Sequence, residues 1–186
     1  TQFLCRILPV YQPKSWSTIL GGNAIKLSER VPREEFETYK VELKELFTEL
    51  TMGFVKAYRN KEDFGDIDVV VRTEPNYNIK KMVLERLNPE EYADNNMFFS
   101  FLYKNAQIDF IMMSPDIFES CQSYFAWNDM GNFMGRVARG IGFKYGHDGL
   151  CYTLRLGDHY KNDIRLSTDP QKIIEFLGYD YDRFER

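Results

Sequence analysis

Three aspartates in two apolar segments are the residues best suited to chemistry. Asp66 and Asp68 stand two positions apart at the start of the apolar run in GDIDVVV, and Asp109 lies in AQIDFIMM. Side chains two positions apart in a β-strand point to the same face, so Asp66 and Asp68 lie side by side while Ile67 points into the core. Adjacent carboxylates repel each other unless a cation holds them. A lone Asp-x-Asp pair is common in solvated turns, so its context decides its meaning.

The third aspartate makes these segments a candidate two-metal site. Asp109 is flanked by Ile108 and Phe110, in a segment otherwise too apolar to hold a charge without a purpose. In-line phosphoryl or nucleotidyl transfer uses two Mg²⁺ ions ~3.5–4 Å apart, one at the attacking oxygen and one at the leaving group. Two aspartates alone seldom hold both ions. If the two segments are neighbouring strands, all three carboxylates converge.

Helices and strands alternate in the segments that must position these carboxylates. Residues 31–50 have helical periodicity, with Pro32 suited to the first helical position and acidic residues after it. A strand is expected at residues 53–59, a polar turn at 60–65, and an apolar, β-branched strand at 67–71. The sequence therefore places the first two aspartates where a turn enters a buried strand.

The second half of the chain continues this alternation. Helical spacing returns at residues 79–87, and two strands follow on either side of a turn at Asn105. Beyond residue 115 the pattern predicts two helices, then short strands at 144–156, and a last helix capped by Asp169 and ended by Gly178. This order predicts an α+β protein with a mixed sheet.

The context of the aspartates resembles the polymerase β family, the X-family DNA polymerases. The segment GDIDVVV, which includes Gly65, follows a basic, polar turn at residues 58–61, and the family's metal-binding motif has the same order of glycine, Asp-x-Asp and apolar strand, with an arginine upstream. RVPREEF at residues 30–36 is similar to the family's entry into its first palm helix. IDFIMMSP is similar to the strand with the third catalytic aspartate.

The resemblance continues toward the C-terminus. SYFAW at residues 123–127 is similar to the Tyr-Phe segment beside the nucleotide's sugar, GFKYGHDGL to the turn after the nucleotide-facing helices, and DPQKIIEFLGYDY to the closing helix. It implies that Tyr124 and Phe125 pack on the incoming sugar and base. Arg136 and Arg139 would face base pair and template, on helical spacings shared with Asn128, Asp129 and Asn132.

The resemblance also implies a domain organisation. Residues 30–114 would form a nucleotidyltransferase palm with a mixed sheet, and residues 115–186 a small α+β lobe that binds nucleotide and template. Residues 1–29 have no counterpart and form an N-terminal extension of unknown role. On this resemblance we expect no counterpart of the lyase and DNA-binding domains of larger family members.

One departure from the family concerns the triphosphate. Where the family has a Gly-Ser pair, this chain has Val-Lys-Ala-Tyr at residues 55–58. Lys56, Arg59 and Lys61 could replace that pair as fixed cations near the β- and γ-phosphates, although Lys56 and Lys61 are equally consistent with solvated turn charges. The Gly21-Gly22-Asn23 segment could form a phosphate-binding nest, or a plain turn.

As to function, the resemblance implies a metal-dependent nucleotidyltransferase that adds dNMP to a DNA 3′-hydroxyl and releases pyrophosphate, as in gap filling. Asp66, Asp68 and Asp109 would be its catalytic residues and hold two Mg²⁺ ions, for which Mn²⁺ can substitute. A nucleoside triphosphate and gapped or primer–template DNA would be its partners. Two alternatives stay open: transfer to another acceptor, such as an RNA end, a protein or a small molecule, and a non-catalytic binding module of the same fold.

The composition limits how nucleic acid can be bound. The formal net charge is -4 and the pI is near 5.3. A uniformly basic binding surface is therefore excluded, because counterion release from phosphates needs clustered Lys and Arg. Any grip on nucleic acid should be local and salt-sensitive.

Cysteine usage and hydropathy bear on the compartment. Cys5, Cys121 and Cys151 are an odd number without a Cys-x-x-Cys spacing, which indicates neither a disulfide framework nor a zinc site and favours a reducing compartment. There is no apolar run of membrane-spanning length, and the first residues lack the order of a secretory signal. We expect a soluble intracellular protein, cytoplasmic or nuclear, without membrane association or an obligate protein partner.

Overall fold

A mixed five-stranded sheet organises the first half of the chain. The computed structural model describes residues 24–157 and 159–186. The strand order is β2 (Met52–Phe54), β4 (Asp66–Arg72), β7 (Ala106–Met113), β6 (Phe98–Tyr103) and β5 (Tyr92–Asn95). Strands β4 and β7 are parallel, and the other neighbours are antiparallel. The expected α+β class with a mixed sheet is confirmed.

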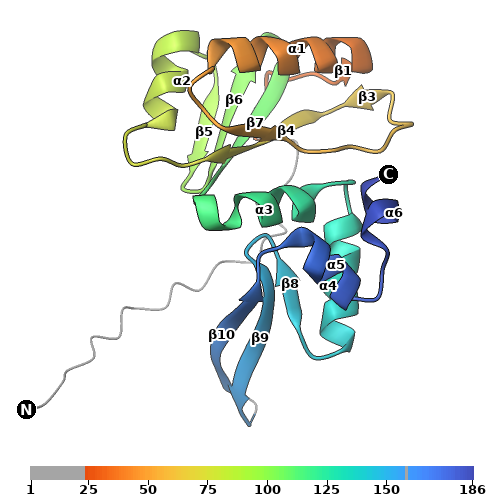
Figure 1. Cartoon of the computed structure of the whole chain (residues 1–186). Helices are drawn as coiled ribbons and strands as arrows, with labels where there is room; N and C mark the ends of the chain where they lie inside the picture. Colours follow the sequence, from red (N-terminus) through yellow and green to blue (C-terminus); the bar gives the residue numbers. More distant parts are fainter. Residues whose placement is uncertain (1–23, 158) are drawn as a thin grey trace, which may run out of the picture.

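Two helices cover one face of this sheet. Helices α1 (Arg33–Leu46) and α2 (Ile79–Leu87) lie above the sheet in Figure 1. Alternate residues of β4, Ile67, Val69 and Val71, are buried in the same core as Leu43 of α1. The intervening positions of β4, which include both aspartates, therefore point to the opposite face.

The entry into α1 differs from the expectation. Pro32 is not the first helical residue but the extended N-cap, and it pairs with Asp63 in a small ribbon of β1 (Val31–Pro32) and β3 (Asp63–Phe64). Strand β3 lies inside the segment expected to be only a turn. The ribbon brings the end of that turn to the start of α1, where the rings of Phe36 and Phe64 stack with centroids 3.8 Å apart.

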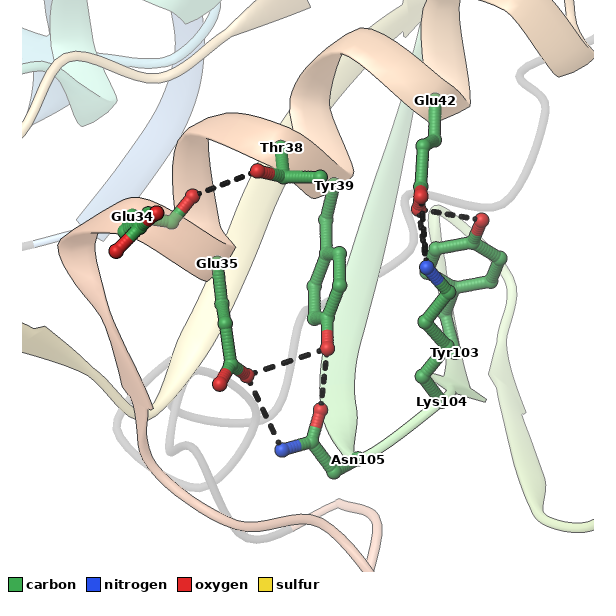
Figure 2. A network of polar contacts seen from close by, with 8 residues as sticks. All are labelled: Glu34, Glu35, Thr38, Tyr39, Glu42, Tyr103, Lys104 and Asn105. Atoms are coloured by element: carbon green, nitrogen blue, oxygen red, sulfur yellow. Dashed lines mark hydrogen bonds and ion pairs between the residues drawn. The ribbon is translucent and has the colours of Figure 1, made fainter.

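Polar contacts fix α1 over the turn between β6 and β7 (Figure 2). The Tyr39 hydroxyl donates to Asn105 Oδ1 at 2.8 Å and lies 3.2 Å from a Glu35 carboxylate oxygen. Glu42 accepts hydrogen bonds from the Tyr103 hydroxyl at 2.8 Å and from the Lys104 ammonium at 2.7 Å. Burial and this carboxylate raise the pKa of Tyr103 to about 12. The helix and the β6–β7 hairpin are thereby held in one relative position.

A smaller lobe follows the sheet. After a short 3-10 helix at Pro115–Ile117, it consists of α3 (Phe118–Phe125), α4 (Met130–Gly140), β8 (Lys144–Gly146), β9 (Gly149–Leu156), β10 (His159–Ser167), α5 (Pro170–Phe176) and α6 (Tyr181–Glu185). Helix α3 lies between the sheet and the rest of the lobe (Figure 1). Its Cys121 is buried against Val70 and Ile111 on the second face of the sheet. The lobe has its own core, which includes Met134, Ala138, Ile173 and Ile174.

The main expected elements are present, but the sequence patterns missed short or polar ones. Asp169 caps α5 by accepting from the Lys172 amide at 3.2 Å, as expected, yet α6 and not α5 is the last helix. Strands β5 and β10 were also not expected, because their residues are largely polar and exposed. The boundaries between extension, palm and lobe remain predictions. The backbone amides of Ile25, Leu27 and Glu29, in the expected extension, donate hydrogen bonds to Gln107, Glu91 and Asn105.

Candidate metal centre

The structure brings the three aspartates together. Asp68 of β4 lies opposite Asp109 of the parallel neighbour β7, and Asp66 lies opposite Gln107. One carboxylate oxygen from each aspartate lies within 4.8 Å of those of the other two, on partly buried residues. This confirms that the two segments are adjacent strands. Three hard oxygen donors at this spacing could hold a metal ion of the Mg²⁺ or Mn²⁺ kind.

A buried glutamine orients the third carboxylate. Gln107 is fully buried, and its Nε2 donates to both oxygens of Asp109, at 3.1 and 3.0 Å. Its Oε1 accepts from the Ile25 amide at 3.1 Å, which fixes which end of the side chain faces Asp109. Ser100, opposite Asp109 on β6, is a second hydrogen-bond donor to this carboxylate. Gln107 and Ser100 act on the candidate metal centre through Asp109.

Without a cation the site is electrostatically strained. Burial, with repulsion from Asp66 and Asp109, raises the pKa of Asp68 well above its ordinary range, and Lys61 lowers it in part. Burial and Asp66 also raise the pKa of Asp109 to about 6, against the hydrogen bonds from Ser100 and Gln107. Like charges held this close disfavour ionisation. A bound cation would remove that cost.

Of the three predicted cations, Lys61 is the one whose charge lowers the pKa of Asp68. It lines a narrow cleft of about 50 Å³ beside Asp66 and Asp68, and its ammonium stands 4.9 Å from the Phe64 ring centroid. The full lining of this cleft is Val55, Lys56, Ala57, Lys61, Phe64, Asp66, Asp68, Phe125 and Asn128. Lys61 is therefore placed to meet an anion bound next to the carboxylates.

The other two predicted cations are engaged by the smaller lobe. Lys56 lines the same cleft, but its ammonium forms an ion pair with Glu185 of α6 and stands 5.7 Å from the Trp127 ring. The Arg59 guanidinium stands 5.8 Å from the same ring and does not line the cleft. Lys56, Arg59 and Lys61 are thus near one another, but only Lys61 acts on Asp68.

An arginine to which the sequence patterns assigned no role holds this basic turn. The Arg33 guanidinium donates to the carbonyls of Tyr58 at 3.2 Å, Arg59 at 3.0 Å and Lys61. Its backbone amide donates to the Glu62 carbonyl at 2.9 Å. Because its side chain hydrogen-bonds to three carbonyl groups of the turn, Arg33 holds the backbone of Lys61 in place beside the cleft.

Gly65 lies between the basic turn and the first aspartate. A Cβ atom at this position would lie 3.1 Å from the Arg30 guanidinium, which pairs with Asp63. Glycine therefore leaves room for this ion pair beside β4. Its predicted part in nucleotide binding stays a prediction.

Of the predicted aromatic pair, only Phe125 lines the cleft. Tyr124 packs in the core of the lobe, with its ring 5.3 Å from that of Tyr145, and its hydroxyl lies 3.4 Å from Asn132 Oδ1. The backbones of α3 and α4 meet here, because a Cβ atom on Gly131 would lie 1.9 Å from the Tyr124 carbonyl oxygen. Tyr124 therefore supports the wall of the cleft that Phe125 forms.

The loop after α3 is hydrogen-bonded to residues 56–58, which connect β2 to the basic turn. The Trp127 amide donates to the Lys56 carbonyl at 2.6 Å, and Asn128 Oδ1 accepts from the Tyr58 amide at 3.2 Å. Trp127 and Asn128 have left-handed backbone angles, with φ of 61° and 57°. Two consecutive residues of this kind cost free energy, which these contacts offset. The loop links the sheet to the smaller lobe at the candidate metal centre.

Arg136 and Arg139 lie on α4, three positions apart, and both are exposed. Neither takes part in an ion pair within residues 24–157 and 159–186. They do not line the cleft. Their predicted role toward nucleic acid remains a prediction, and the predicted nest at residues 21–23 lies outside the described residues.

The sequence contained signals for some of the missed residues. Gln107 is two positions before Asp109 in the same apolar strand, so alternation alone places both on one face. Arg33 and Trp127 carry no such signal, because each acts through contacts between segments distant in the chain.

Comparison with known proteins does not assign the chain to a family: it matches no family model and no curated protein. No helix of the described residues is long and apolar enough to cross a membrane.

Proposed function

We propose that this protein is a metal-dependent nucleotidyltransferase of the DNA polymerase β type, which adds a dNMP to a DNA 3′-hydroxyl and releases pyrophosphate. The observation that carries the proposal is the convergence of Asp66, Asp68 and Asp109 from two parallel strands. The Asp-x-Asp context and the order of the other segments, which resemble that family, support it. The basic turn held by Arg33 next to the carboxylates supports it as well.

The donor set fits the metal that this chemistry requires. The carboxylates of Asp66, Asp68 and Asp109 are hard oxygen ligands, and burial together with their mutual repulsion raises the pKa of Asp68 and of Asp109. Mg²⁺ bound there would polarise the attacking hydroxyl and neutralise charge on the leaving pyrophosphate. Mn²⁺ prefers similar ligands.

The chain's own residues have defined tasks in this proposal. The primer 3′-oxygen attacks the α-phosphorus, the bond from that phosphorus to the bridging oxygen breaks, and pyrophosphate leaves. Asp109, oriented by Gln107, is the carboxylate placed to accept the hydroxyl proton. Lys61 stabilises charge on the triphosphate. Phe125 closes the cleft from the side of the lobe.

The size of the cleft has a consequence for nucleotide binding. A volume of about 50 Å³ admits cations and water, whereas sites for ligands of nucleotide size measure several hundred Å³. We infer that the α3–α4 loop separates from residues 55–61 when a nucleotide enters. The contacts to be broken are the hydrogen bonds from the Trp127 amide to the Lys56 carbonyl and from the Tyr58 amide to Asn128, together with the ion pair between Lys56 and Glu185 of α6. Closure of such lobes around a nucleotide is a common step in transferases.

The test is extension of a labelled primer across a one-nucleotide gap, with Mg²⁺ and all four deoxynucleotides. We expect templated addition by the wild type, none by Asp109→Ala, and normal addition by Asp94→Asn, a matched change on the exposed strand β5 of the same sheet. Wild-type protein that binds Mn²⁺ but extends no gapped, nicked or single-stranded DNA would contradict the DNA substrate and favour another acceptor. Failure to bind Mn²⁺ at all would contradict the metal centre and leave a non-catalytic binding module.

A further inference from the structure

The hairpin of β9 and β10 has one apolar face that its own lobe covers only in part. Strand alternation puts Leu150, Tyr152, Leu154 and Leu156 on the same face of β9. Their exposed fractions are 4, 45, 44 and 66% in that order. The apolar stripe thus begins in the core of the lobe and continues outward into solvent.

The reason is the length of the helix that covers this face. Helix α5 has seven residues, and its Phe176 packs on Phe143, whose ring lies 5.1 Å from that of Phe176 and 6.2 Å from that of Tyr152. The strands extend beyond α5, and the hairpin projects away from the five-stranded sheet (Figure 1). On β10, Ile164 lies opposite Tyr152 and is 47% exposed. We call Tyr152, Leu154, Leu156, Ile164 and Phe176 the apolar hairpin face.

The paired charges of the hairpin that the structure describes lie on its other face. There Asp163 accepts from the Thr153 hydroxyl at 2.8 Å and pairs with Lys144 at 2.7 Å, and Arg165 pairs with Asp116 at 2.7 Å. Among the described side chains, the polar neighbours of the apolar hairpin face on β10 are Asn162, opposite Leu154, and His159, opposite Leu156. Apolar side chains with these described neighbours favour an apolar partner, such as the same face of a second copy.

We propose that the apolar hairpin face is a self-association surface, on which two copies of this chain pack hairpin against hairpin about a two-fold axis. Flat apolar sheet faces pack on each other at ~10 Å with interdigitating side chains. Five side chains that are each about half exposed contribute roughly 500 Å² per copy, or roughly 1,000 Å² for the pair. That area lies at the lower limit for specific interfaces, so the dimer is a weak one that forms reversibly.

The proposed contact leaves the candidate metal centre open. The three aspartates belong to the sheet, on the side that faces α3, whereas the tip of the β9–β10 hairpin lies at the far end of the smaller lobe (Figure 1). Self-association and nucleotidyl transfer are therefore separate properties. The test below uses no activity measurement, so its failure would not bear on the proposed function.

The test is sedimentation equilibrium of the full chain from ~1 to ~100 µM, the range in which an interface of this size should associate. We expect the apparent mass to rise from 22.0 kDa toward twice that value. Leu156→Glu should raise the dissociation constant at least ~10-fold, because it places an unpaired charge in the contact. Ile164→Glu should act in the same direction from the neighbouring strand.

Two matched controls separate this surface from general stickiness or misfolding. Val41→Glu changes a side chain on α1 that is 56% exposed, and Arg155→Glu changes an exposed neighbour on the charged face of the hairpin. Both should associate as the wild type does, and all variants should keep the wild-type circular dichroism spectrum. A wild type that stays monomeric over the whole range, or equal weakening by Leu156→Glu and Arg155→Glu, would overturn the proposal.

Discussion

Replacing Asp109 by asparagine should stabilise the metal-free protein at neutral pH while it removes the response to metal. The amide that replaces the carboxylate would keep an oxygen that can accept from Gln107 Nε2, so the hydrogen bond is preserved. What is lost is one negative charge beside Asp66 and Asp68. In the absence of a cation, that loss removes the cost of burying the charge and also relieves its repulsion with Asp66.

The magnitude follows from the pKa of Asp109, which is raised from 3.8 to about 6. This difference corresponds to a penalty of roughly 3 kcal/mol on the ionised carboxylate in the folded state. Because the folded pKa is the higher one, the folded state retains its proton between about pH 4 and pH 6 while the unfolded state loses it. The free energy of unfolding therefore falls as pH rises through this window and stays lower above it.

Thermal unfolding in EDTA at two pH values measures this effect. For a chain of this length 1 kcal/mol corresponds to roughly 2–4 °C, so Asp109→Asn should raise the melting temperature at pH 7.5 by roughly 6 °C or more. At pH 4.5 the difference from the wild type should shrink, because the wild-type carboxylate is then largely protonated in the folded state. Asp94→Asn, which removes an exposed carboxylate of β5 paired with Lys80, should show no such gain at pH 7.5.

Metal should reverse the order of stability. Adding Mg²⁺ or Mn²⁺ should raise the melting temperature of the wild type, because the ion binds only the folded site, and should leave Asp109→Asn almost unchanged. The reasoning is refuted if Asp109→Asn is no more stable than the wild type in EDTA at pH 7.5, or if it gains as much stability from metal.

Four further predictions concern the surroundings of the aspartates. Gln107→Leu should weaken Mn²⁺ binding by roughly 10–100-fold in a calorimetric titration, because the third carboxylate loses its orienting donor. Lys61→Met should raise KM for the nucleotide and leave Mn²⁺ affinity within a few-fold. Glu185→Gln should lower KM by a few-fold, since a surface ion pair contributes at most about 1 kcal/mol, and an unchanged or higher KM would contradict an opening step. Gly131→Ala should destabilise the protein by more than ~2 kcal/mol in urea unfolding through its clash with α3, whereas Gly140→Ala, with no atom within 4 Å of the added carbon, should be neutral or stabilising.

The aspartates show how much of the candidate site can be predicted from local sequence pattern. Alternation within a strand places Asp66 beside Asp68, and the apolar setting of Asp109 marks it as unusual, so the candidate metal centre could be predicted from two short segments. That β4 and β7 are parallel neighbours, with Asp68 opposite Asp109, was a condition of this prediction. The condition concerns segments about forty positions apart, and only the folded sheet fulfils it.

The surroundings of the site were less accessible from the sequence. Lys56, Arg59 and Lys61 are close in the chain and chemically alike, yet Lys56 is paired with Glu185 and only Lys61 lowers the pKa of Asp68. Tyr124 and Phe125 are adjacent, but the turn of the helix sends one into the core of the lobe and the other to the cleft. Residues of similar chemistry that are close in the sequence therefore have different surroundings, because tertiary contacts decide which side chain reaches the cleft.

The sequence by itself determined the α+β class, most helices and strands, and the three carboxylates, because these depend on periodicity, capping and alternation within a few residues. The tertiary structure alone decided that Arg33 holds the basic turn, that Gln107 is fixed by Ile25, and that the end of the β9–β10 hairpin stays uncovered. Each of these depends on which distant segments meet and on how long they are relative to one another. Local free-energy preferences do not contain that information, since it arises only when the whole chain packs.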